Sequence, residues 1–280
     1  MPGPTQPADP ERWFRTRPDS SVLTRPRLLA RSLIPLPDLD EHIGYYERLL
    51  GVPADLRMPI PDFGGLELAA VGNVLLIASS RPFTPIQRQT RYSLVVPHLA
   101  QQLDLLEATG TTVVEPPEPI LPGARARVRY PDGTLAELVE HRPWSGEQPR
   151  TAMPGTARPR PRETGLRLLP RHAVAETDFP ATVRLYEKLL QAPARPAGHL
   201  TGPVDAPAAT VGDLLVVGLP DSAVTDAAQP RVALIVPASA PDPTAGTVLL
   251  AGQWGADVWT EKTPAASRPA PRVRPGASHA

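Results

Sequence analysis

Arginine is the residue type whose spacing in this chain points to a binding chemistry. Arg31 and Arg91 recur as Arg171 and Arg231, at one and the same shift along the chain. A guanidinium group stays protonated in proteins, so it cannot coordinate a metal ion, but it grips carboxylate, phosphate or sulfate through paired hydrogen bonds. The recurrence predicts a shared role for these arginines, either in recognising an anion or in a structural ion pair.

Other reactive side chains are scarce. Cysteine is absent, which excludes disulfides, thiolate metal sites and thiol catalysis. His172 follows Arg171 directly and is expected to point to the opposite face of a strand. The six histidines mostly lie outside the predicted strands; they are His42, His98, His141, His172, His199 and His279.

The overall charge and hydropathy narrow the function classes. Lys plus Arg and Asp plus Glu both number 29, so the formal net charge is zero and a nucleic-acid partner is not expected. No apolar run approaches the ~20 residues that span a bilayer, and the N-terminal segment has no apolar core of a signal peptide. We therefore expect a cytoplasmic protein without a membrane partner.

Proline marks the predicted domain boundaries. The 39 prolines are concentrated in three stretches that lack apolar periodicity. We interpret these stretches as a disordered N-terminal tail over residues 1–26, a Pro/Arg-rich linker over 143–166 and a disordered C-terminal tail over 263–280. The linker separates a first domain, residues 27–142, from a second and degenerate domain, residues 167–262.

The two domains are copies of one unit. RLLAR at 27–31 returns as RLLPR at 167–171, and YERLL at 46–50 returns as YEKLL at 186–190. The same shift aligns VGNVL at 71–75 with VGDLL at 211–215. A constant shift over separate blocks indicates duplication of a unit of about 120 residues.

Each unit is expected to open with a strand and a helix. After a strand at 28–36, Ile43, Tyr46 and Leu50 fall on one face of a helix that Gly51 ends. Short strands follow, and the same order starts again with a strand at 92–96. This order predicts an α+β protein with two βαβββ modules in each domain, the last module of the second domain being incomplete.

Two segments carry a resemblance to a known family. DLDEHIGYYERLLG at 38–51 resembles the opening module of the vicinal-oxygen-chelate superfamily, and YPDGTLAELVE at 130–140 resembles its closing hairpin. The superfamily includes glyoxalase I, extradiol dioxygenases, fosfomycin-resistance enzymes and bleomycin-binding proteins. The resemblance implies two tandem domains, each with paired modules forming a cup, docked as an internal pseudo-dimer. In metal-dependent members, strand side chains, commonly His and Glu, hold a divalent ion in the cup.

Carried onto this chain, the metal positions fall on poor ligands. In the first cup they are Arg31, Leu76, Arg91 and Glu137, and in the second they are Arg171, Val216 and Arg231. Only Glu137 can ligate a metal ion, so no metal and no other cofactor is expected. The resemblance places Arg31, Arg91 and Glu137 on one face of the first cup. The expected apolar lining of that cup is Leu33, Leu76 and Val95.

Two interpretations of this cluster stay open. Arg31 and Arg91 could form an anion-binding floor on which Glu137, the only catalytic candidate, orients a ligand amine or acts as a general base. Alternatively, the same residues form a structural ion pair in a cup that binds nothing. The leading hypothesis is metal-independent binding of an anionic or partly apolar small molecule, as in the bleomycin-resistance branch. The alternatives are a metal-dependent lyase, isomerase or dioxygenase, and a non-catalytic structural or regulatory scaffold.

Overall fold

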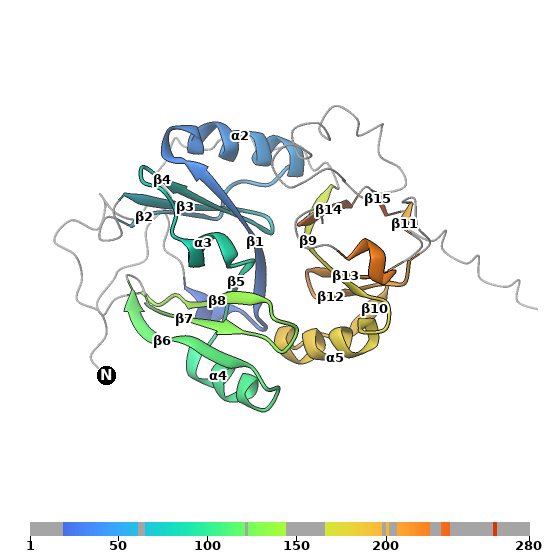
Figure 1. The fold of residues 1–280 in the computed structure, drawn as a ribbon. Coiled ribbons are helices and arrows are strands. Elements are labelled where there is room, and N and C mark those ends of the chain that lie inside the picture. The colour runs from blue at the N-terminus through green and yellow to red at the C-terminus, as the bar shows by residue number, and fades with distance from the viewer. Residues whose placement is uncertain are drawn as a thin grey trace, which may run out of the picture.

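The computed structural model describes residues 19–60, 65–120, 123–143, 166–197, 200–201, 206–224, 231–235 and 260–261. The C-terminal tail, the interior of the linker and most of the end of the second domain were predicted on residues outside these ranges. The described residues form two halves, one before and one after the linker (Figure 1).

The first half is a single eight-stranded sheet made of two modules. The first module comprises β1 (Arg27–Pro35), α2 (Leu39–Leu50), β2 (Leu56–Ile60), β3 (Leu66–Val71) and β4 (Val74–Ser79). The second comprises β5 (Tyr92–Val95), α4 (Leu99–Glu107), β6 (Thr112–Ile120), β7 (Gly123–Arg129) and β8 (Leu135–Glu140). The strand order β2-β3-β4-β1-β5-β8-β7-β6 joins the modules through an antiparallel β1–β5 pair.

The sheet curls into a half-barrel, with α2 and α4 on its outer, convex side (Figure 1). Leu39, Ile43, Tyr46 and Leu50 bury one face of α2, and Gly51 ends the helix at a φ of 68°. The short helix α3 (Pro85–Gln89) connects the modules, and the neighbouring Phe83 packs on the concave side of the sheet. The paired βαβββ modules and the cup shape expected from the family resemblance are confirmed.

The second half repeats the first module and the first strand of the next. Its elements are β9 (Arg167–Ala175), α5 (Phe179–Leu190), β10 (Ala194–Pro196), β12 (Ala208–Val211), β13 (Leu214–Leu219) and β14 (Val232–Ile235). They form a sheet in the order β10-β12-β13-β9-β14. A separate pair joins β11 (Leu200–Thr201) to β15 (Thr260–Glu261).

The duplication is visible in the register of the strands. Arg31 pairs with Leu75 across β1 and β4, and their repeat counterparts Arg171 and Leu215 pair in the same way across β9 and β13. The helices α2 and α5 begin and end at residues that correspond at the same shift. The second copy lacks the glycine that ends α2, and Gln191 adopts the left-handed conformation in its place, at a φ of 50°.

The second half covers the convex side of the first-half sheet. Leu168, Val232 and Leu234 from β9 and β14 pack into the core beneath α2. On the other side, Tyr186 and Leu189 of α5 join the core beneath α4. Two apolar clusters, one beneath α2 and one beneath α4, therefore cross the boundary between the halves.

The described part of the chain begins at residue 19, before the predicted first domain. Ser20, in the short 3-10 helix η1 (Ser20–Val22), is buried, and its backbone N–H donates to the carbonyl of His141 at 3.0 Å. Residues 19–22 were assigned to the disordered tail, but these contacts attach them to the end of the first half. The other 3-10 turns are η2 (Leu36–Asp38) and η4 (Asp221–Ala223).

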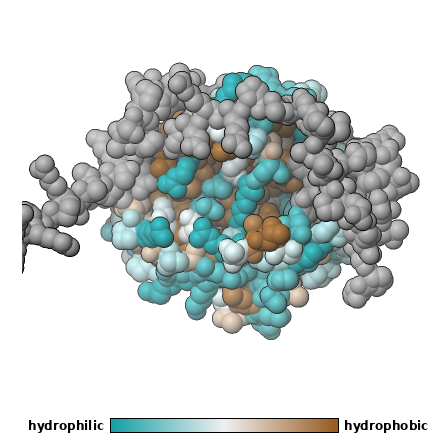
Figure 2. All heavy atoms as spheres, turned by 180° about the vertical axis from the view of Figure 1, so that it is seen from behind, coloured by the Kyte–Doolittle hydropathy of each residue, from teal (hydrophilic) through white to brown (hydrophobic). Residues whose placement is uncertain are grey.

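The exposed surface of the described part contains both hydrophilic and hydrophobic side chains. On the face opposite to that of Figure 1, hydrophilic side chains surround smaller hydrophobic groups (Figure 2). Within the described ranges, the helices are too short or too polar to cross a membrane.

The shared interior predicts unequal effects of equivalent substitutions on α5 and α2. Leu189 is fully buried between the halves, whereas its counterpart Leu49 is only partly buried. We expect Leu189→Ala to lower the free energy of unfolding by about 2–5 kcal/mol and Leu49→Ala to lower it by less than half as much. Urea unfolding followed by circular dichroism measures both. Equal losses would contradict the assignment of α5 to the contact between the halves.

Candidate functional site in the first cup

The concave face of the first sheet is apolar on one side and charged on the other. Because side chains alternate along a strand, Leu29, Arg31 and Leu33 of β1 share this face. The apolar side contains Leu29, Leu56, Met58, Ala70, Leu75 and Ile77, with Leu33 and Val95 packed against them. Leu33 and Val95 therefore lie where the sequence analysis placed them.

Leu76 and Val216 lie on the wrong face to line a cup. Leu76 belongs to the core beneath α2, and Val216 belongs to the core that α5 shares with the first half. Their assignment to the cups is corrected. The alignment was shifted by one residue, and a shift of one residue moves a strand side chain to the opposite face of the sheet.

Three arginines converge on Glu137 at the charged side of the cup. Nη1 of Arg31 lies 2.5 Å from Oε2 of Glu137. Oε1 of the same carboxylate accepts from Arg125 at 3.0 Å and from Arg127 at 3.2 Å. Ser93 completes the group, because its hydroxyl accepts from Arg31 at 2.9 Å and donates to Glu137 at 3.4 Å. These five residues are called the Glu137 cluster below.

The members of the Glu137 cluster differ in exposure. The side chains of Arg31 and Arg127 are each only 3% exposed, and that of Glu137 is 14% exposed. Arg125 is 23% exposed and also binds Glu118, whose side chain is 47% exposed. Arg127 additionally donates to Glu115 at 2.5 Å. The cluster thus has a buried floor and a solvent-accessible edge at Arg125.

The surrounding charges set the protonation state of Glu137. Burial alone would raise the pKa of this carboxyl, but the positive charges of Arg31, Arg127 and Arg125 outweigh that effect and lower the pKa to about 2. Glu137 is therefore ionised throughout the neutral range. A carboxylate of such low basicity is a poor general base.

Arg91 does not join this cluster. Its guanidinium group donates to the hydroxyl of Tyr92 at 3.0 Å and to the backbone carbonyl of Arg171 at 3.2 Å, so it is directed toward the second half. The expectation that Arg91 shares a floor with Arg31 and Glu137 is wrong. Ser93 occupies the corresponding place, because it lies directly beside Glu137 in the β5–β8 register.

The equivalent arginines of the second half, Arg171 and Arg231, are neighbours through their backbones but differ in burial. Arg171 is fully buried on β9, and the apolar residues Leu169 and Ala173 share its face of the strand. Arg231 is exposed just before β14, and its carbonyl accepts from the backbone N–H of Arg171 at 2.8 Å. His172 points to the opposite face from Arg171, as predicted, and meets Asp132 of the first half.

The cluster does not fit a metal ion. Of its five members only Glu137 has a side chain suited to ligating a divalent metal, and its carboxylate is already bound by arginines. No group of three histidine, aspartate or glutamate side chains with a geometry suitable for a metal occurs in the described ranges. A metal-dependent reaction therefore finds no suitable set of donors there.

The sequence analysis missed Arg125, Arg127 and Ser93. The segment RARVR at 125–129 places arginine at every second position, which is the spacing of one strand face. In the β7–β8 register Arg127 lies opposite Glu137. That alternation, combined with the hairpin turn at Asp132 and Gly133, indicates that Arg125 and Arg127 share the strand face of Glu137.

Comparisons with known proteins give structural neighbours only. No family model and no curated protein matches the chain. An uncharacterised protein from Methanosarcina mazei is 33% identical over 41% of this chain and 92% of its own, with a TM-score of 0.37. The 2,3-dioxygenase LapB from Pseudomonas sp. KL28 is 14% identical over 88% and 94% of the two chains, at 0.44. The Mn(II)-bound glyoxalase from Novosphingobium aromaticivorans is 12% identical over 86% and 81%, at 0.41.

The low pKa of Glu137 predicts a pH dependence of stability. Because the pKa is about 2 in the folded protein and 4.5 in the reference state, the stabilisation is complete above pH 4.5 and is lost as the pH falls toward 2. Its size is on the order of 3 kcal/mol. We expect Glu137→Gln to lower the free energy of unfolding at pH 7 by about 3–5 kcal/mol, since the buried Arg31 and Arg127 each lose an ion pair with Glu137.

The matched control is Glu107→Gln, which removes an exposed carboxylate at the end of α4. Urea unfolding at several pH values between 7 and 2.5 should show a flatter profile for Glu137→Gln than for the wild type or the control. If Glu137→Gln is too unstable to measure, Arg125→Gln should give a smaller loss in the same direction. Identical profiles for all variants would refute the role assigned to Glu137.

Proposed function

We propose that this chain, which has the paired-module fold of the vicinal-oxygen-chelate superfamily, binds a small molecule in its first cup without a metal ion. The observation that carries the proposal is the Glu137 cluster at the charged side of an otherwise apolar cup. The ligand has one anionic group and an apolar body. Its anionic group binds Arg125, and its apolar body lies against Leu33 and Val95.

Arg125 is the member of the cluster that a ligand can reach. Its partner Glu118 is more exposed than Arg125 itself, and ion pairs of exposed side chains contribute only about 0–1 kcal/mol. A ligand carboxylate or sulfonate therefore displaces Glu118 at little cost. Arg31 and Arg127 stay in place, because both are bound to Glu137 in the buried floor and Arg127 is also bound to Glu115.

The apolar side of the cup supports a ligand that has an apolar body in addition to its anionic group. Leu33, Leu68 and Val95 are only partly buried, so apolar surface remains available beside the charged group. Burying such surface stabilises a complex by roughly 25 cal/mol per Å² before the costs of association. Anionic recognition at one end and apolar contact at the other suit an amphiphilic small molecule.

Binding is preferred to acid–base catalysis because of the state of Glu137. Its pKa of about 2 leaves it without a proton to donate and with little tendency to accept one near pH 7. Of the residues at the metal positions, only Glu137 could ligate a divalent ion, and its carboxylate is already bound by arginines. The cluster is therefore better suited to hold a ligand in place than to transform it.

Substitutions at the edge of the cup should change affinity in opposite directions. Arg125→Gln removes the accessible cation, whereas Glu118→Gln removes its competitor. With an anilinonaphthalene sulfonate dye as the probe, we expect affinity to fall roughly tenfold in Arg125→Gln. In Glu118→Gln affinity should rise roughly two- to fivefold. Fluorescence titration of the folded protein at pH 7 gives both dissociation constants.

Glu107→Gln again serves as the control, because it makes the same change of charge as Glu118→Gln on the convex side. It should leave the dissociation constant unchanged. An unsulfonated anilinonaphthalene should bind more weakly than the dye and should not respond to either edge substitution. If Glu118→Gln and Glu107→Gln behave alike, the cup is not the binding site.

A further inference from the structure

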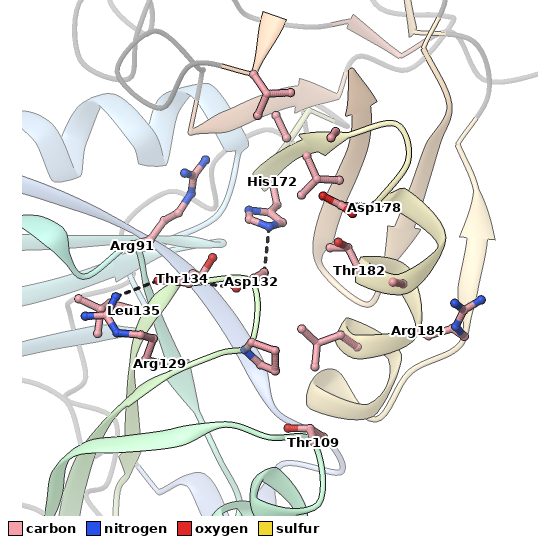
Figure 3. A pocket seen from close by; sticks show the side chains of 18 of the residues that line it. Arg91, Thr109, Arg129, Asp132, Thr134, Leu135, His172, Asp178, Thr182 and Arg184 are labelled. Carbon is pink, nitrogen blue, oxygen red and sulfur yellow. Dashed lines mark hydrogen bonds and ion pairs between the residues drawn. The ribbon is translucent and has the colours of Figure 1, made fainter. Parts of the chain in front are cut away.

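A large cleft lies between the two halves, away from the first cup. Its volume is about 1320 Å³, and its walls come from the loop after β7, the segment before β5, β9 and α5. The sequence analysis gave this region no role. Figure 3 shows Arg91 and Arg129 on the first-half side of the cleft and α5 on the other side.

The walls of the cleft carry an excess of positive charge. Two carboxylates line it, Asp132 and Asp178. Six cationic side chains line it: Arg88, Arg91, Arg129, Arg184, Lys188 and Arg231. The chain as a whole is neutral, so this concentration of cations is a local feature. A concave surface with one dominant sign of charge attracts ligands of the opposite sign.

The duplication brings two equivalent arginines to this one cleft. Arg91 and Arg231 occupy the same position in the two copies, and both contact the backbone of Arg171. Nη2 of Arg91 donates to the Arg171 carbonyl at 3.2 Å, while the Arg231 carbonyl accepts from the Arg171 N–H at 2.8 Å. The recurrent arginines thus meet at the boundary between the halves instead of lying in separate cups.

Asp132, one of the two carboxylates that line the cleft, is already hydrogen-bonded to neighbouring side chains and backbone. Asp132 Oδ2 lies 3.0 Å from Nε2 of His172 and accepts from the hydroxyl of Tyr186 at 3.2 Å. Its Oδ1 accepts from the backbone N–H of Thr134 at 2.9 Å. Burial alone would raise the pKa of Asp132, but the bonds from His172 and Thr134 outweigh it and lower the pKa. Asp132 serves the contact between the halves and is only 13% exposed, so it competes weakly for the cations that line the cleft.

We infer that the cleft between the halves binds a small, multiply charged anion, such as a phosphorylated or polycarboxylated metabolite. Cations line both walls of the cleft, so a ligand with two or more anionic groups can contact cations of both halves at once. The volume exceeds the ~300–1,000 Å³ usual for small-molecule sites, so it admits a ligand of that class with solvent. The inference concerns a second site and does not depend on the binding proposed for the cup.

The test is isothermal titration calorimetry of the full chain with inorganic pyrophosphate and, separately, with citrate. The substitutions are Lys188→Gln and Arg231→Gln, both of exposed cleft cations. Arg48→Gln is the matched control, because Arg48 occupies on α2 the position of Lys188 on α5 and does not line the cleft. We expect each cleft substitution to weaken binding roughly three- to tenfold and the control to leave it unchanged.

The two probes separate phosphate from carboxylate recognition. Tighter binding of pyrophosphate assigns the cleft to phosphorylated ligands, and tighter binding of citrate assigns it to polycarboxylates. Thermal melting of each variant confirms that it is folded. Absence of binding by both probes at millimolar concentration, or an equal loss of affinity in Arg48→Gln, would overturn the inference. A retained affinity in both cleft variants would overturn it as well.

Discussion

The convex face of the eight-stranded sheet must be removed from water, and the arrangement of the chain follows from that constraint. The helices α2 and α4 cover the two wings of the sheet, but the central strands β1 and β5 lie between them (Figure 1). Leu28, Ala30 and Leu94 of these strands are almost fully buried. Their cover comes from β9, β14 and α5 of the second half. A chain with only the first half would expose this apolar surface, so the duplicated module has a structural role whatever it binds.

With the convex face covered, two concave surfaces remain open: the first cup and the cleft between the halves. In the first cup, three arginines converge on Glu137. Glu115 and Glu118 pair with Arg127 and Arg125, so three carboxylates balance the three guanidinium groups. Breaking such a buried network costs more than forming it contributes, so it persists even where no ligand selects for it. What distinguishes a binding surface from a purely structural ion pair is the exposed edge at Arg125, where the partner Glu118 is held only at the surface.

The sequence predicted the architecture more accurately than the site, for a physical reason. The constant shift between the copies could be aligned on whole blocks, and it holds in the structure for α2 and α5 and for β1 and β9. The prediction of a site residue depends on the alternation of side chains along a single strand, where an alignment error of one residue places the side chain on the opposite face. The assignment of Leu76 to the cup was wrong for this reason. The assignment of Arg91 was wrong by two residues, because Arg91 precedes β5 and its side chain turns toward Tyr92. The pairing of Arg31 with Glu137 succeeded because both lie well inside their strands.

The repeated arginines illustrate how duplication alters the meaning of a recurring position within one chain. In separate domains, Arg91 and Arg231 would mark the same place in two cups. Here the second half lies against the back of the first, and the backbone of Arg171 joins both positions. The pairing of Asp132 with His172 depends on the same contact, with one partner from a hairpin turn and the other from β9. Docking of the halves therefore creates a charged surface that neither half has alone, and the chemistry of this protein is to be sought at that boundary as well as in the cup.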